Sequence, residues 1–124
     1  MTKRVLDVGQ CGPDHAAIRR LVQGTFGAEV VQADRLDDAL AALRTQSFHL
    51  VLINRKLDID YSDGIDVLRA IKQQPEAAAV PVMLVTNYPE HQQAAVAAGA
   101  EPGFGKAELA HPETREKLSR FLEA

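Results

Sequence analysis

Short runs of consecutive apolar residues alternate along the chain with longer segments in which apolar residues recur every three or four positions. The short runs predict strands of a parallel sheet at residues 5–8, 29–32, 50–53 and 82–85. A fifth, poorer strand is expected near residues 103–104, where Pro102, Gly103 and Gly105 crowd the run. A strand this weak belongs at an edge of the sheet.

The segments of helical period predict five helices, one after each strand. The first follows Pro13 and Asp14, the fourth covers residues 90–98 and stops at Gly99, and the fifth begins at Pro112. Their apolar faces contain Ile18, Leu21, Val22 and Phe26, then Leu36, Ala39, Leu40 and Leu43, then Ile65, Leu68 and Ile71, and finally Leu118, Phe121 and Leu122. This alternation predicts one doubly wound α/β domain over residues 1–124, with a parallel sheet of five strands.

The composition and net charge of the chain exclude several classes of function. The chain has 124 residues with 46% apolar and 25% charged side chains, which is typical of a globular domain. Its net charge of -3 and the lack of a Lys/Arg run argue against direct nucleic-acid binding. The apolar runs are far shorter than the roughly 20 residues that cross a membrane. The start of the chain does not resemble a signal peptide and Cys11 is the single cysteine, so we expect a cytoplasmic protein.

Polar residues follow the predicted strands. Gly9 and Gln10 come after the first strand, Asn54 after the third, Thr86 after the fourth and Lys106 after the fifth. In doubly wound sheets, ligands bind beyond the carboxyl ends of the strands. We therefore expect these side chains to converge and to form the functional corner of the domain.

These positions, with Asp63-Gly64 opening the third helix and Gly99-Ala100 closing the fourth, resemble the receiver domain of two-component response regulators over the whole chain. The resemblance implies a flavodoxin-like sheet of strand order 2-1-3-4-5 and no separate output domain in this chain. The family carries an acidic pair after the first strand, a phosphorylatable Asp after the third, and a Thr/Ser and a Lys after the fourth and fifth. Thr86 and Lys106 retain that pattern.

Three positions depart from the family's site. Gly9 and Gln10 stand in place of the acidic pair, and Asn54 stands in place of the phosphorylatable Asp. Mg²⁺ needs hard oxygen ligands that usually include carboxylates, and an amide is not a nucleophile for phosphoryl transfer. We therefore predict a degenerate pseudo-receiver without metal, cofactor or enzyme activity. The four histidines lie too far apart in the sequence to predict a zinc site.

Further departures lie near the same corner. The segment from Asn54 to Gly64 is two residues longer than is usual in the family. Asn87 replaces the small residue that usually follows the Thr, and Gly103 stands where an aromatic switch residue is common. Phe104 is shifted by one position and should face the other side of its strand. These differences predict a remodelled corner.

Removal of the acids is expected to change the local charge balance. We expect Asp58, Asp60 or Asp63 to pair with the cations Lys106, Arg55 and Lys56. Asp7 lies inside a strand that is buried on both faces, so its carboxylate needs a partner, such as His49 or a backbone donor. Installing Asp at positions 9, 10 and 54 together is expected to create Mg²⁺ binding.

Three functions are compatible with the sequence. The first is a signalling module that binds another protein, such as a histidine kinase or a downstream effector, as a monomer or weak homodimer and without Asp phosphorylation. The resemblance favours a partner surface formed by Ala94, Ala95, Ala98 and Phe104, although alanines also simply favour helix formation. The second is a phosphorelay receiver that is phosphorylated at Asp58 or Asp60. The third is a sensor that binds an anion or small molecule at Lys106, Thr86 and Asn54.

Overall fold

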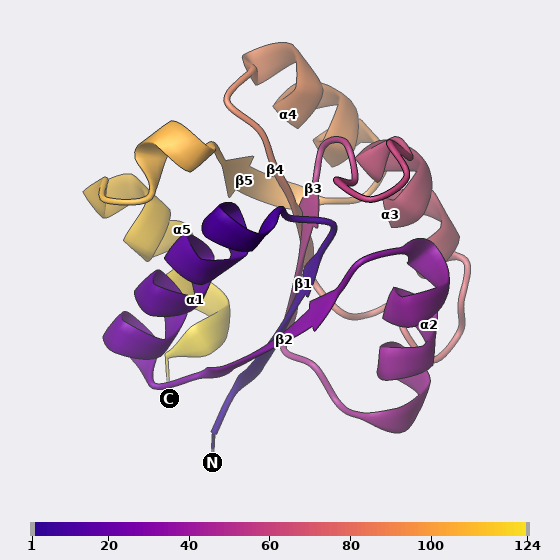
Figure 1. The fold of residues 1–124 in the computed structure, drawn as a ribbon, viewed down its shortest axis with the longest axis horizontal. Helices are drawn as coiled ribbons and strands as arrows, with labels where there is room; N and C mark the ends of the chain where they lie inside the picture. The colour runs from indigo at the N-terminus through magenta and orange to yellow at the C-terminus, as the bar shows by residue number, and fades with distance from the viewer. Residues whose placement is uncertain (1, 124) are drawn as a thin grey trace.

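Five parallel strands form the central sheet of the computed structural model, which describes residues 2–123 (Figure 1). They are β1 (Arg4–Val8), β2 (Glu29–Ala33), β3 (Leu50–Asn54), β4 (Val82–Val85) and β5 (Glu101–Phe104). Their order in the sheet is β2-β1-β3-β4-β5. The predicted doubly wound, flavodoxin-like fold is therefore confirmed, and β5 lies at an edge as expected.

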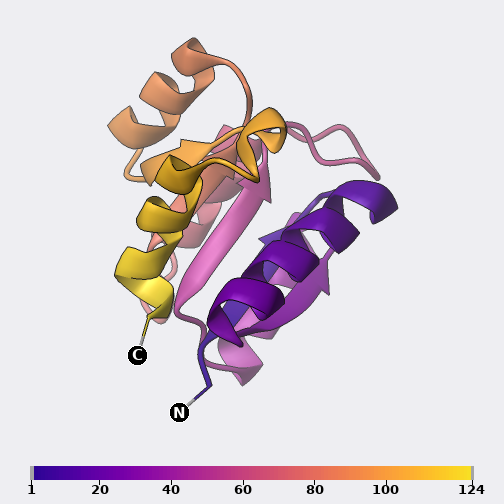
Figure 2. The same cartoon turned by 90° about the vertical axis from the view of Figure 1, so that its left-hand side faces the viewer.

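Two helices cover one face of the sheet and three cover the other (Figures 1 and 2). The first layer contains α1 (Gly12–Phe26) and α5 (Pro112–Leu122), and the second contains α2 (Leu36–Thr45), α3 (Gly64–Lys72) and α4 (Pro89–Ala97). A short 3₁₀ helix, η1 (Lys106–Glu108), follows β5. No helix within residues 2–123 is long and apolar enough to cross a membrane.

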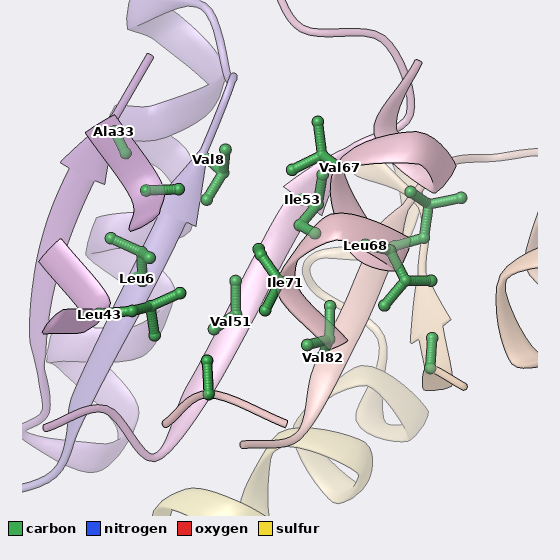
Figure 3. Packing of buried hydrophobic residues seen from close by; sticks show 14 of the residues in the cluster. Leu6, Val8, Ala33, Leu43, Val51, Ile53, Val67, Leu68, Ile71 and Val82 are labelled. Atoms are coloured by element: carbon green, nitrogen blue, oxygen red, sulfur yellow. The ribbon is translucent and has the colours of Figure 1, made fainter. Parts of the chain in front are cut away.

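The residues of the inner strands β1, β3 and β4 are largely buried because both faces of the sheet are covered, whereas most residues of the edge strand β2 are half-buried or exposed. Leu52 and Ile53 are neighbours on β3 that belong to opposite clusters, and neither is exposed to solvent. Burial of a side chain of this size contributes about 1.5–3 kcal/mol. Figure 3 shows the cluster under α2 and α3, where Ile53 lies beside Val67 and Ile71.

The pairing of β4 with β5 is irregular, and a side chain from α4 bridges the gap. The register shifts between Met83 and Val85. Gln92 Nε2 donates to the Leu84 carbonyl at 2.9 Å, and the Gly103 amide donates to Gln92 Oε1 at 3.0 Å. A Cβ at Gly103 would overlap the Leu84 carbonyl, so this approach requires glycine. The Gln92 amide thus fastens α4 to both strands.

Candidate functional site

The turn after β1 brings Gly9 against the loop that follows β3. The Gly9 amide donates to the Ala33 carbonyl at 2.8 Å, and the residue has a φ of 79°, a conformation that favours glycine. A Cβ built at Gly9 would overlap the side chain of Leu57, which is fully buried. An apolar side chain therefore fills the space beside Gly9, where the resemblance implies a carboxylate.

The Gly9 carbonyl is also engaged. It accepts the Asn54 side-chain amide at 3.2 Å and the backbone amide of Asp58 at 2.9 Å. Gln10 is buried beside this turn, and its side-chain amide has no hydrogen-bond partner within residues 2–123. The structure thus brings Gly9 and Asn54 into direct contact, as the sequence predicts, but as a closed hydrogen-bonded corner.

Expected Mg²⁺ binding after installation of Asp at positions 9, 10 and 54 conflicts with this packing. Position 9 has no space for a side chain while Leu57 occupies its place. Any residue other than glycine would also hold a positive φ there, at a cost of roughly 1 kcal/mol. The packing of Leu57 therefore opposes this expectation in the present loop conformation, and Mg²⁺ binding by the triple variant stays a prediction.

Lys106 has a carboxylate partner that the sequence did not predict. Its Nζ lies 2.6 Å from Oδ2 of Asp14, in the first turn of α1. This hydrogen bond lowers the pKa of Asp14 below its usual value. The pairing expected with Asp58, Asp60 or Asp63 is therefore wrong for Lys106.

The loop acids have other roles. Asp63 Oδ1 accepts the Ile65 amide at 2.9 Å and caps the start of α3. Asp60 Oδ1 accepts the Ser62 amide at 3.0 Å, within its own turn. Among the described residues, neither Arg55 nor Lys56 forms an ion pair. The acids of the loop after β3 thus form no direct ion pair with Arg55 or Lys56 among the described residues.

Asp7 points toward α1 and contacts His15. Its Oδ2 lies 2.6 Å from His15 Nδ1, whereas its Oδ1 has no partner in residues 2–123. Burial raises the pKa of Asp7 to about 6, and the hydrogen bond and charge of His15 oppose that rise. The proposed His49 contact is wrong, because His49 Nδ1 accepts the Arg4 amide at 3.0 Å.

The longer loop after β3 forms a turn of its own. Lys56 and Asp63 pair across it as an isolated antiparallel bridge, and the Leu57 amide donates to the Ser62 carbonyl at 2.9 Å. Tyr61 has a φ of 60° and an exposed ring. The loop thus sends Leu57 inward and leaves Tyr61 at the surface.

Thr86, Asn54 and Lys106 lie together around one cavity of about 290 Å³. It opens at the carboxyl ends of the strands and is also lined by Arg55, Lys56, Val85, Asn87 and Tyr88. Thr86 Oγ1 accepts the Tyr88 amide at 3.3 Å and lies 3.4 Å from His91 Nδ1. Asn87 Oδ1 accepts the Ala107 amide at 3.1 Å, which ties the turn after β4 to the turn after β5.

The residues expected to form a partner surface have different environments. Ala94 is exposed and Ala98 is half-buried, whereas Ala95 and Phe104 are almost completely buried. Phe104 packs in the cluster that contains Leu118 and Leu122 of α5. Neither Ala95 nor Phe104 therefore presents its side chain to solvent.

A threonine after β4 and a lysine after β5, at the carboxyl edge of a doubly wound sheet, define a receiver-type α/β domain. Residues 13–108 match the model of the response regulator receiver domain, so the chain belongs to that family. It is thus a signalling module of a class that interacts with kinases and effectors and is typically not enzymatic.

Solved structures share this fold at low sequence identity. Chemotaxis protein CheY4 from Vibrio cholerae is 23% identical, with 98% of this chain and 100% of that chain covered and a TM-score of 0.78. A response regulator receiver protein from Pseudomonas putida is 19% identical, with coverages of 97% and 98% and a TM-score of 0.80. No curated protein matches the sequence.

Proposed function

We propose that this domain is a pseudo-receiver, which signals by binding another protein and does not accept a phosphoryl group on an aspartate. The observation that carries the proposal is the position of the Leu57 side chain, which fills the space beside Gly9. A metal-assisted transfer needs a water-accessible pocket with anionic ligands there, and an aliphatic side chain supplies neither. Asn54, bound to the Gly9 carbonyl, offers no carboxylate nucleophile.

The alternative of phosphorylation at Asp58 or Asp60 has weaker support. Both residues are exposed on the loop after β3, and neither lines the cavity that contains Thr86 and Lys106. Thr86 and Lys106 are the groups that would stabilise charge on a transferred phosphoryl group. An acid on this loop is therefore poorly placed to use them.

We propose that the partner binds over α4, β5 and α5. A shallow cavity of about 500 Å³ lies there, and its walls are mainly apolar. It is lined by Gln92, Gln93, Val96, Ala97, Pro102, Gly103 and Lys117. Val96 is 43% exposed and lines this cavity. Val96 therefore takes the central place in the surface, instead of the buried Ala95.

Incubation with acetyl phosphate and Mg²⁺, followed by intact-mass measurement, tests the first part of the proposal. The mass should remain that of the unmodified chain. A stable adduct of one phosphoryl group that maps to Asp58 or Asp60 would refute the pseudo-receiver proposal. It would establish that the domain is a receiver phosphorylated on the loop after β3. A phosphorylatable receiver domain in the same tube serves as the positive control.

Capture of partners from a lysate of the source organism tests the second part. The Val96→Arg variant should lose the partner that the wild type retains, because a charged side chain would have to be buried at the centre of the surface. Ile59→Arg is the matched control, since Ile59 is 50% exposed and lies on the loop after β3. Equal capture by wild type and Val96→Arg would refute this surface. Light scattering at several concentrations would detect a homodimer.

A further inference from the structure

The cavity beyond the ends of β3 and β4 is lined by positively charged side chains and is large enough for a small ligand. Three cationic side chains line its volume of about 290 Å³, namely Arg55, Lys56 and Lys106, and no carboxylate does. Sites for small molecules usually begin near 300 Å³. The cavity is therefore at the lower limit of that class, and it has room for more than a bare inorganic ion.

The charge in this cavity is available to a ligand. Arg55 and Lys56 are exposed and have no ion-pair partner in the part of the chain that the structure describes. Lys106 is held by Asp14, which offsets much of its charge. The chain as a whole has a net charge of -3, so this concentration of cations is opposite in sign to the average surface. A local excess of positive charge raises the local concentration of anions.

A second, smaller cavity adjoins the first and shares two of its three cations, Arg55 and Lys56. It has a volume of about 180 Å³ and is lined by Arg55, Lys56, Tyr61 and Asp63. Lys56 Nζ lies 5.8 Å from the centre of the Tyr61 ring. Asp63 is the one acid in this wall, and its Oδ1 is used by the Ile65 amide. Arg55 and Lys56 thus form a positively charged ridge between two hollows.

Neutral and aromatic groups complete the first cavity. The Thr86 hydroxyl accepts the Tyr88 amide and lies 3.4 Å from His91 Nδ1, so its hydrogen can point to a ligand oxygen in the tautomer in which Nδ1 carries the ring proton. The Tyr88 ring is 58% exposed at the cavity wall, and the His91 ring holds it edge-on at 5.4 Å. An exposed, oriented ring of this kind provides a stacking surface for a planar group.

We propose that this cavity binds a small phosphomonoester without covalent chemistry. Its phosphate would lie between Arg55, Lys56 and Thr86, with the organic part against Tyr88. Lys106 would contribute fully only when Asp14 is removed or displaced. The inference goes beyond the proposed protein-binding function, because the partner surface over α4 and α5 uses other residues.

NMR titration of the full chain at low salt tests the proposal, with inorganic phosphate, AMP and adenosine as probes. We expect shifts of the Arg55, Lys56, Thr86 and Lys106 amides with phosphate and with AMP, tighter binding of AMP, and no binding of adenosine. Absence of shifts with both anions would overturn the site. If AMP binds no more tightly than inorganic phosphate, the proposed contact between the organic part of the ligand and Tyr88 is wrong.

Variants distinguish specific binding in this cavity from non-specific electrostatic attraction of the anion to the protein surface. Arg55→Gln and Lys56→Gln should each weaken AMP binding about tenfold, and the double variant should abolish it. Asp14→Asn should strengthen binding severalfold, because it releases Lys106 from its partner. Arg19→Gln, an exposed change on α1, is the control and should bind like wild type. Unchanged affinity in the double variant would refute the proposal.

Discussion

Leu57 occupies the space that any side chain at Gly9 would need. The two residues lie on different loops, after β3 and after β1, and each depends on the other. Leu57 is buried because Gly9 has no Cβ, and Gly9 holds a φ of 79° that the turn requires. An acid placed at position 9 would therefore first have to displace the Leu57 side chain before its carboxylate could bind a metal.

Gly9→Asp should destabilise the domain by about 2–4 kcal/mol, the sum of overpacking against Leu57 and an unfavourable positive φ. Urea unfolding followed by circular dichroism measures the change. Gly24→Ala is the control, since no atom lies near that position in α1, and it should be neutral or stabilising by up to about 1 kcal/mol. A second change, Leu57→Ala, should cost less stability in Gly9→Asp than in wild type, because it removes the overlap between the two side chains. Wild-type stability of Gly9→Asp alone would contradict the packing described.

The Asp7 carboxyl group should make stability depend on pH. Burial raises its folded-state pKa from 3.8 to about 6, so the folded state binds more protons than the unfolded state between these values. The corresponding stabilisation is fully present below the unfolded pKa and is lost as the pH rises through about 6. Between pH 4 and pH 7, wild type should lose up to about 3 kcal/mol relative to Asp7→Asn.

Urea unfolding of wild type and Asp7→Asn at each pH unit from 4 to 7 measures this difference. His15→Asn keeps the buried carboxylate but removes its partner at 2.6 Å. It should therefore lose more stability at pH 7, where Asp7 is ionised, than at pH 4. A free-energy difference between wild type and Asp7→Asn that is constant with pH would show that Asp7 keeps an ordinary pKa.

Gln92→Ala should destabilise the edge of the sheet by about 1–3 kcal/mol, because the Gly103 amide and the Leu84 carbonyl lose their shared partner. The Gly103 amide should also exchange with solvent much faster, which hydrogen exchange by NMR measures. Gln93→Ala is the matched control, being the adjacent and exposed glutamine on α4. Equal protection of Gly103 in both variants would mean that Gln92 does not bridge the strands.

The positive φ of Tyr61 predicts that a glycine is tolerated better at this position than at a neighbouring position of the same loop. A φ of 60° is unfavourable for tyrosine and easy for glycine, and the Tyr61 ring is largely exposed. Tyr61→Gly should therefore be more stable than Ile59→Gly, a similar change nearby without positive φ, by about 1 kcal/mol. Thermal unfolding of the two variants is the measurement. A more stable Ile59→Gly would show that Tyr61 is not strained.

The sequence predicts the elements well and the side-chain contacts of the corner poorly. Apolar periodicity reports burial on each face, so the five strands, the five helices and the edge position of β5 follow from it. The pairs Asp14–Lys106 and Asp7–His15 join different elements, and their choice depends on loop paths that periodicity does not encode. Leu57 carried a usable signal, as an aliphatic residue in a polar loop close to a strand end.

The ion pair between Asp14 and Lys106 has a consequence for the order of assembly during synthesis. Strand β1 lies between β2 and β3, so a three-stranded sheet can form once β3 has left the ribosome. Lys106 follows β4 and β5 in the chain and therefore emerges later. Until then Asp14 lacks this partner, and the late arrival of Lys106 joins α1 to η1, the 3₁₀ helix that follows β5. The contact that balances the corner is thus among the last that a nascent chain can make.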